Sequence, residues 1–123
     1  MDGLIIKKKW IDKILYGDKI LEIRGSQTKK IDQMIYILES GSRRVRGKCL
    51  ISGCIPIDTE EKWEELKSSH CVDISYKELL KIYKKPYAWI LENVEAMSDD
   101  LYYEHPKGAV IWLKDVEVFV EKN

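Results

Sequence analysis

The sequence predicts a single α+β domain whose mixed or antiparallel sheet is curled into a small β-barrel. A chain of 123 residues has room for one hydrophobic core, so we expect residues 1–123 to form one domain. About six segments have the pattern of β-strands and about three have that of helices. The last three strand-like segments follow one another directly, whereas a doubly wound parallel sheet needs strands and helices to alternate. These observations favour a curled sheet flanked by helices.

The first quarter of the chain predicts a strand, a helix and a second strand. Residues 3–7 form a short apolar segment, as in a buried strand. Gly17 then follows an amphipathic segment as a helix stop, because glycine adopts the left-handed conformation without steric cost. Residues 20–24 have the pattern of a strand. The apolar residues at helical spacing before the stop are Trp10, Ile11, Ile14 and Leu15.

The middle of the chain predicts two strands and two helices. Residues 34–38 and 47–57 are strand-like, and Ser40-Gly41-Ser42 turns the chain between them. Asp58-Thr59-Glu60-Glu61 and Ser75-Tyr76-Lys77-Glu78 both have the form of a capping box, which marks the start of a helix.

The end of the chain returns to strands. Residues 87–94, 109–113 and 116–120 are rich in residues that favour β-structure. The turn signal His105-Pro106-Lys107-Gly108 precedes the second of these segments.

Composition excludes several classes of protein. The 21 Lys+Arg balance the 21 Asp+Glu, and 45% of the residues are apolar, so disordered, collagen-like and coiled-coil classes are excluded. No run of about 18 apolar residues exists and no secretion signal is visible, so we expect a cytoplasmic protein with no membrane contact. Cys49, Cys54 and Cys71 are odd in number, which favours reduced thiols.

The neutral net charge hides an asymmetry along the chain. Residues 1–57 hold twelve Lys/Arg and six Asp/Glu, a surplus of +6, and the remaining residues carry −6. Because ordinary salt confines each charge's influence to about 10 Å, a basic half can supply a local anion-binding surface. The alternative is that these side chains form a solvated face, and charge alone favours that interpretation.

Spacing disfavours a metal site and a serine nucleophile. Cys49 and Cys54 point to opposite faces of a regular strand, and adjacent His70-Cys71 lacks the paired spacing of structural zinc sites. Ser40 lies in a turn without a G-x-S-x-G elbow. Gly-rich nucleotide loops are absent as well, so we expect neither a metal nor a cofactor.

The segment from Gly17 to Arg24 carries the strongest chemical signal, because it places Lys19, Glu22 and Arg24 at a helix-to-strand junction. Strict alternation puts Glu22 and Arg24 on the same face of the strand. In a structural interpretation they form a surface ion pair worth about 0–1 kcal/mol, and Lys19 is a solvated turn residue. In a functional interpretation Lys19 and Arg24 present positive charge at a cleft, while Glu22 accepts hydrogen bonds from a ligand. The residues alone leave both interpretations open.

This segment resembles the signature of the ASCH family, a branch of the PUA-like superfamily. The resemblance rests on Gly17-x-Lys19-x-x-Glu22-x-Arg24 after a short amphipathic helix, and on three further segments in matching order. They are Ile35-Tyr36-Ile37-Leu38-Glu39 with Ser40-Gly41, Pro86-Tyr87-Ala88-Trp89, and Pro106-Lys107-Gly108-Ala109-Val110-Ile111-Trp112. The resemblance spans nearly the whole chain. It implies a small β-barrel flanked by helices, with a cleft beside the motif that handles RNA or a nucleoside-like ligand.

The resemblance implies several possible activities. Members of the family and superfamily include RNA-binding modules, ribonucleases and a bacterial branch that hydrolyses the amide of N-acetylated cytidine with a lysine nucleophile. Lys19 matches that lysine, Glu22 stands where that branch has threonine, and Asp73 is the nearest match to its downstream glutamate. An anionic Glu22 would hold Lys19 charged, whereas a nucleophilic lysine needs a pKa well below about 10.4. We therefore expect Lys19 to bind an anion.

The sequence-based hypothesis is a domain that binds RNA or a modified nucleoside. Unpaired bases bind by stacking on exposed rings beside a positive groove. The aromatic candidates are Trp10, Tyr36, Tyr87 and Trp89, although packing in the core is the commoner fate of each. The alternative is a hydrolase, an amidohydrolase or metal-independent ribonuclease, with Lys19 as nucleophile or base and Glu22 or Asp73 assisting. The expected ligand-binding residues are Lys19, Glu22, Arg24, Ser40, Gly41, Arg43, Arg44, Arg46, Tyr87 and Trp89.

Overall fold

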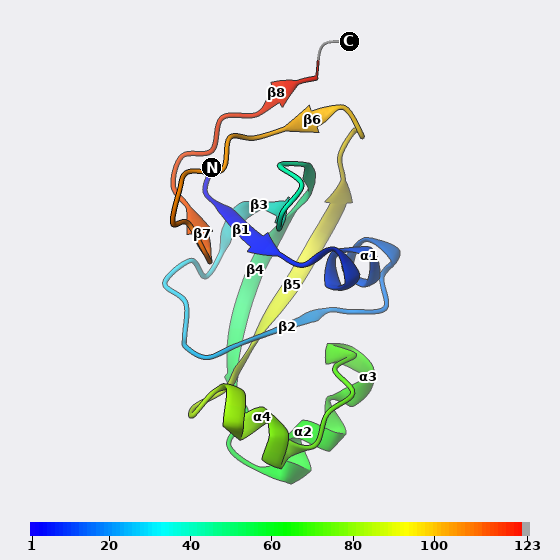
Figure 1. Cartoon of the computed structure of the whole chain (residues 1–123). Helices are drawn as coiled ribbons and strands as arrows, with labels where there is room; N and C mark the ends of the chain where they lie inside the picture. The colour runs from blue at the N-terminus through cyan, green and yellow to red at the C-terminus, as the bar shows by residue number, and fades with distance from the viewer. Residues whose placement is uncertain (122–123) are drawn as a thin grey trace.

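A six-stranded mixed sheet forms the centre of the protein. The computed structural model describes residues 1–121. The strands of the sheet are β1 (Gly3–Ile6), β2 (Leu21–Arg24), β3 (Gln33–Glu39), β4 (Val45–Pro56), β5 (Tyr87–Ala96) and β7 (Trp112–Leu113). They lie in the order β2-β5-β4-β3-β1-β7, with β1 parallel to β3 and the other neighbours antiparallel. The sheet curls into a half-barrel with β2 and β7 as its outer strands (Figure 1), which confirms the predicted α+β class.

Within residues 1–121, four helices flank the sheet, where the sequence predicted about three. They are α1 (Lys8–Tyr16), α2 (Glu60–Glu65), α3 (Lys67–His70) and α4 (Tyr76–Ile82). Thr59 is the N-cap of α2, and its side chain accepts a hydrogen bond from the Lys62 N–H at 3.1 Å. The predicted capping box of Ser75 and Glu78 is present at the start of α4. Over the described residues, no helix combines the length and apolar character needed to span a membrane.

The C-terminal strands are shorter than the sequence predicted. The expected strands over 109–113 and 116–120 reduce to β7 and to β8 (Phe119–Val120). Asp115 adopts a left-handed backbone with φ of 50°, which turns the chain after β7. β8 pairs with β6 (Leu101–Tyr102), a strand the sequence did not indicate, in a separate two-stranded ribbon. Figure 1 places this ribbon at the opposite end of the sheet from α2, α3 and α4.

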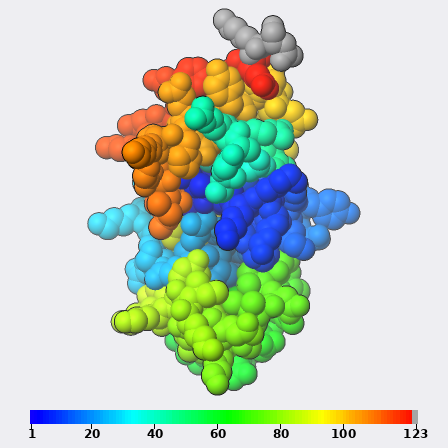
Figure 2. Space-filling model, viewed as in Figure 1, coloured from blue at the N-terminus to red at the C-terminus, as the bar shows by residue number. Residues whose placement is uncertain are grey.

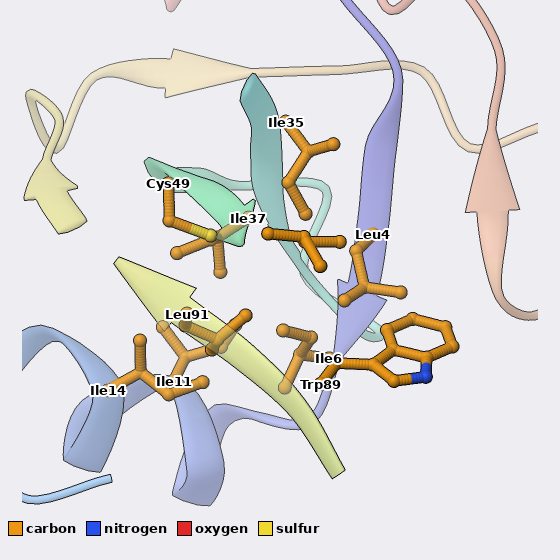
Figure 3. Packing of buried hydrophobic residues seen from close by; sticks show 10 residues of the cluster. Leu4, Ile6, Ile11, Ile14, Ile35, Ile37, Cys49, Trp89 and Leu91 are labelled. Carbon is orange, nitrogen blue, oxygen red and sulfur yellow. The ribbon is translucent and has the colours of Figure 1, made fainter. Parts of the chain in front are cut away.

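The main core lies between α1 and the concave side of the curled sheet. Ile11 and Ile14 of α1 are buried against apolar side chains from four strands (Figure 3). Helical spacing put these two isoleucines on one face, which is why a helix of nine residues can cover the sheet. The strand residues of this cluster are Leu4, Ile6, Ile35, Ile37, Cys49, Ile51, Trp89 and Leu91.

A second cluster joins α2, α3 and α4 to the end of the sheet that carries β2. Trp63 and Leu79 are each 1% exposed and pack with Leu21 and Ile23 of β2. The indole Nε1 of Trp63 donates a hydrogen bond to the Ile74 carbonyl at 2.8 Å. The helices therefore cover one face of β2 and fix the position of the strand that carries the signature residues.

Gly47 is required where β4 pairs with β5. A Cβ at this position would lie 2.6 Å from the Glu95 carbonyl oxygen and 3.0 Å from Leu15 Cδ2. Since backbone cannot move aside as a side-chain tip can, we expect Gly47→Ala to lower the free energy of unfolding by about 1–3 kcal/mol. Urea denaturation would measure this loss. Gly53→Ala is the control, because its Cβ would meet only the flexible Ile90 side chain, with Cδ1 at 3.1 Å. Equal losses in the two variants would contradict this explanation.

Candidate functional site

The signature segment runs from the end of α1 into β2. Gly17 has φ of 105° and ends α1, and its N–H donates to the Lys13 and Ile14 carbonyls at 3.1 and 3.2 Å. The Lys19 N–H also donates to the Lys13 carbonyl, at 3.1 Å. This tight turn, which needs a residue that tolerates positive φ, directs Lys19 inward immediately after the helix.

Lys19 is buried, with 1% of its surface exposed. Its Nζ donates a hydrogen bond to the His70 carbonyl at 2.6 Å and lies 3.7 Å from Glu22 Oε1. The same nitrogen lies 4.8 Å from the centre of the Trp10 ring. The expectation that Lys19 presents its charge at a cleft mouth was wrong, because α3 and Trp10 cover the amine.

Burial lowers the pKa of the Lys19 amine below its ordinary value of 10.5. The nearby Glu22 carboxylate raises this pKa, as the sequence suggested, but desolvation has the larger effect. No local pattern indicates this burial, so the net direction that we expected for the pKa of Lys19 was wrong. A lysine with a lowered pKa loses its proton more easily than a surface lysine does.

Glu22 and Arg24 form a largely buried ion pair on one face of β2. Arg24 Nε and Nη2 donate to Glu22 Oε2 at 3.0 and 2.7 Å, and the side chains are 15% and 5% exposed, respectively. Arg24 Nη2 also donates to the Ile5 carbonyl of β1 at 3.0 Å. The same-face prediction is confirmed, but the pair is not the exposed surface pair of the structural interpretation. Removing either partner of a buried pair costs about 3–5 kcal/mol because the other charge is left uncompensated.

The carbonyl that accepts the hydrogen bond from Lys19 belongs to His70. Its Nδ1 accepts a hydrogen bond from the Val72 N–H at 2.9 Å, and its Nε2 lies 3.0 Å from the Trp63 carbonyl. Since a carbonyl only accepts, Nε2 carries the proton and the ring is neutral. The ring stacks on Trp63 with centroids 3.7 Å apart. Burial lowers the pKa of His70 below its ordinary value of 6.5.

A cleft of about 300 Å³ opens above the Glu22–Arg24 pair, and we call it the signature cleft. Besides the pair, its lining includes two aromatic side chains, Trp10 and Tyr83, and the polar residues Lys7 and Ser40. Tyr83 packs on Gly25, where a Cβ would lie 2.6 Å from the ring atom Cδ1. The cleft therefore combines a charged floor with aromatic walls, at the small end of the range for ligand sites.

The loop after β3 meets this cleft only in part. Ser40 lines it, but the Ser40 N–H donates to the Ile6 carbonyl at 2.9 Å, so this amide is not the free donor the sequence suggested. Gly41 and Arg43 line a neighbouring hollow instead. Arg44 Nη2 pairs with Asp99 Oδ1 at 3.0 Å.

Several predicted residues lie away from the signature cleft. Arg46 is paired with Asp12 and Glu39, which removes it as a free phosphate contact. Trp89 is 2% exposed and donates its Nε1–H to the Ser26 carbonyl, so its ring belongs to the core and cannot serve as an exposed stacking surface (Figure 3).

Tyr87 and Asp73 are also placed apart from the cleft lining. Tyr87 is half-buried and lines a different hollow, where its hydroxyl lies 3.4 Å from Gln27 Nε2. Asp73 has a side chain that is 94% exposed and pairs with Lys67 at 3.2 Å. An exposed carboxylate paired on the surface is poorly placed to assist a buried Lys19.

Sequence reasoning missed Tyr83, Lys7 and His70 as parts of the site. Tyr83 follows α4 and His70 ends α3, and both approach β2 only through the packing of these helices. No local pattern signals such a contact. Among residues 1–121, no three His, Cys, Asp or Glu side chains gather in a way that could hold a metal ion.

The lowered pKa of His70 predicts a pH dependence of stability. At a pH between the folded and unfolded pKa values the unfolded chain binds the His70 proton and the folded chain does not, so stability falls as pH drops below about 6.5. Between about pH 7.5 and about pH 5.5, we expect the free energy of unfolding to fall further in the parent than in His70→Asn. The difference between the two falls should be at most about 1.4 kcal/mol. Urea denaturation of both proteins at both pH values would measure this difference. His105 is present in both proteins, so identical losses would contradict a neutral, buried His70.

Comparisons with solved structures place the fold. The crystal structure of ASCH from Zymomonas mobilis is similar with a TM-score of 0.63 and 15% identity, covering 77% of this chain and 68% of that chain. Two point mutants of the same protein give TM-scores of 0.63 and 0.64 at 15% identity. They cover 77% and 79% of this chain, and 69% and 72% of theirs. At this identity the likeness concerns the fold.

Comparisons of sequence place the family. No curated protein matches the chain. The sequence model of the ASCH domain matches residues 4–101, which include the whole signature segment, strands β2 to β5 and all of β1 except Gly3. Since the match extends over well more than half of the chain, the protein belongs to the ASCH domain family.

Proposed function

We propose that the signature cleft binds a base of single-stranded RNA or of a modified nucleoside. The observation that carries this proposal is the buried Glu22–Arg24 pair at the floor of a small cleft whose lining includes Trp10 and Tyr83. Buried ion pairs are a poor source of stability, because desolvation offsets much of their attraction. A carboxylate and a guanidinium facing a cleft are well suited to hydrogen bonds with a ligand.

The polar floor complements the edge of a nucleobase. Arg24 directs Nε and Nη2 to Glu22 and to the Ile5 carbonyl, which leaves its Nη1 hydrogens for a ligand. Glu22 Oε1 is 3.7 Å from Lys19 Nζ, too far for a strong hydrogen bond, so this oxygen can accept from a ligand. A base edge carries donors and acceptors side by side, and proteins read unpaired bases through such edges.

The aromatic walls supply stacking. Trp10 lies on the face of α1 that meets the cleft, and Lys9 Nζ lies 4.5 Å from the centre of its ring. Lys9 is exposed, so a base can take its place over the ring. Stacking of a base on an aromatic side chain contributes about 1–3 kcal/mol and tolerates different bases.

Lys19 supports this site from beneath. Its Nζ, covered by Trp10 and the His70 carbonyl, is close to Glu22 but is not part of the cleft surface. When charged, Lys19 partly offsets the negative charge of Glu22. Its role in binding is therefore to hold Glu22 in place, and the direct contacts with a base come from Glu22 and Arg24.

Replacing Trp10 tests the proposal. We expect Trp10→Leu to weaken binding of a labelled single-stranded RNA of about ten nucleotides by about 5- to 100-fold, because the stacking surface is lost. Fluorescence anisotropy would measure the affinity. Trp112→Leu is the matched control, since Trp112 stacks on Trp89 and does not line the signature cleft. Unchanged affinity in Trp10→Leu, or an equal loss in both variants, would contradict the proposed site.

A second candidate function is hydrolysis of an amide on an acylated nucleoside. The observation that favours it is the lowered pKa of Lys19, because a neutral amine can attack a carbonyl carbon. Glu22 Oε1 lies 3.7 Å from Lys19 Nζ, so it would accept a proton from Lys19 through a bridging water. Asp73 is not needed in this scheme. For attack to occur, the acyl group has to reach past Glu22 to the covered amine.

Loss of the Lys19 amine tests this second function. With N-acetylated cytidine as substrate, we expect the parent to release acetate and Lys19→Met to release none. Chromatography of the nucleoside product would follow the reaction. Lys67→Met is the control, because Lys67 pairs with Asp73 on the surface. No turnover by the parent, or turnover by Lys19→Met at the parental rate, would exclude Lys19 as the nucleophile.

A further inference from the structure

A second hollow of about 330 Å³ lies beside the signature cleft, and we call it the arginine hollow. It is lined by Ile5, Ser40, Gly41, Arg43, His105 and Val110, together with Ala109. Ile5, Ser40 and Val110 line the signature cleft as well, so the two hollows meet along these residues. Figure 2 shows the loop after β3, the start of the chain and the segment before β7 gathered on one face of the molecule.

Arg43 contributes the positive charge in the lining of this hollow. Within residues 1–121 it forms no ion pair, whereas the neighbouring Arg44 and Arg46 are paired with carboxylates. The lining of the arginine hollow contains no aspartate or glutamate. Arg43 also lines a larger hollow, where Arg44 is paired with Asp99 and the carboxylates of Asp99 and Glu121 disfavour an anion. The guanidinium of Arg43 is therefore available to an anionic group in the arginine hollow.

The backbone around Arg43 is fixed in an uncommon conformation. Arg43 has φ of 62° and Gly41 has φ of 83°, both in the left-handed region. The Arg43 carbonyl accepts from the Tyr103 N–H at 2.8 Å, which ties the loop to the segment after β6. Non-glycine residues in this region carry strain, and such residues cluster where a ligand is held. No atom lies within 4 Å of a Cβ built on Gly41, so a ligand can approach its backbone.

His105 fixes the opposite rim. Its Nε2 lies 2.8 Å from the Ala109 carbonyl and its Nδ1 lies 3.1 Å from the Tyr103 hydroxyl. Contacts at both nitrogens hold the ring and the turn over 105–109. Val110 follows this turn, lines both hollows and is 74% exposed.

We propose that the arginine hollow is a phosphate subsite, so that the ligand of the signature cleft is a nucleotide, free or within an RNA strand, and not a free nucleoside. A guanidinium binds phosphate through paired, charge-assisted hydrogen bonds. The shared wall of Ile5, Ser40 and Val110 places this subsite directly beside the base. The inference rests on the proposed function, since it needs a base in the signature cleft.

Matched ligands and a loop variant test the subsite. The probes are the four ribonucleosides, their 5′- and 3′-monophosphates and inorganic phosphate, titrated by calorimetry into the parent, Arg43→Gly, Arg43→Lys and Arg44→Ala. We expect at least one monophosphate to bind the parent about tenfold or more tightly than its nucleoside. Glycine accommodates the φ of 62°, so Arg43→Gly removes the guanidinium without straining the loop. It should abolish the preference and leave nucleoside affinity unchanged.

The other variants and ligands separate the outcomes. Arg43→Lys should keep part of the preference and Arg44→Ala all of it, because Arg44 already pairs with Asp99. Equal affinity for nucleoside and monophosphate, or a preference that survives in Arg43→Gly, overturns the phosphate subsite while leaving the base site intact. Inorganic phosphate that binds as tightly as the best monophosphate overturns the nucleotide assignment. If the parent binds no nucleoside, nucleotide or single-stranded RNA, the proposed function fails, and the inference with it.

Discussion

The buried pair of Glu22 and Arg24 is the interaction on which the functional face of this protein depends. Arg24 joins β2 to the Ile5 carbonyl of β1, although these two strands are separated by β5, β4 and β3 in the order of the sheet. The guanidinium thus spans the open side of the half-barrel. A charge in this position is tolerated only because Glu22 and the carbonyl satisfy it. The same pair therefore joins two strands of the curled sheet and forms the floor of the signature cleft.

A buried lysine and the helices that cover it surround the pair. Lys19 lies beneath Glu22, and the carbonyl that holds Lys19 belongs to His70, whose ring is fixed by the stack on Trp63. The helices α2, α3 and α4 therefore do more than cover β2, because their packing sets the position and the pKa of a buried amine. Arg44 and Arg46 pair with carboxylates from other parts of the chain, whereas Arg43 forms no ion pair within residues 1–121.

The sequence was sufficient for the fold class, the strands from β1 to β5, the Gly17 helix stop and the same-face pair. It could not reveal that both faces of β2 are covered, since alternation predicts one buried and one exposed face and the covering helices come from about forty residues further along the chain. The burial of Lys19 was hidden for the same reason. The partners of Arg44 and Arg46 are Asp99, Asp12 and Glu39, which no local spacing connects to them.

The most direct test of the central claim is to observe the pair while RNA is added. In an NMR titration with a single-stranded RNA of about ten nucleotides, the account predicts saturable shifts of the Arg24 Nε–H and Trp10 Nε1–H resonances. The Trp63 Nε1–H, bonded to the Ile74 carbonyl inside the helical cluster, should not move. Binding of the RNA with no change at Arg24 and Trp10 would contradict the account, because the ligand would then lie outside the signature cleft.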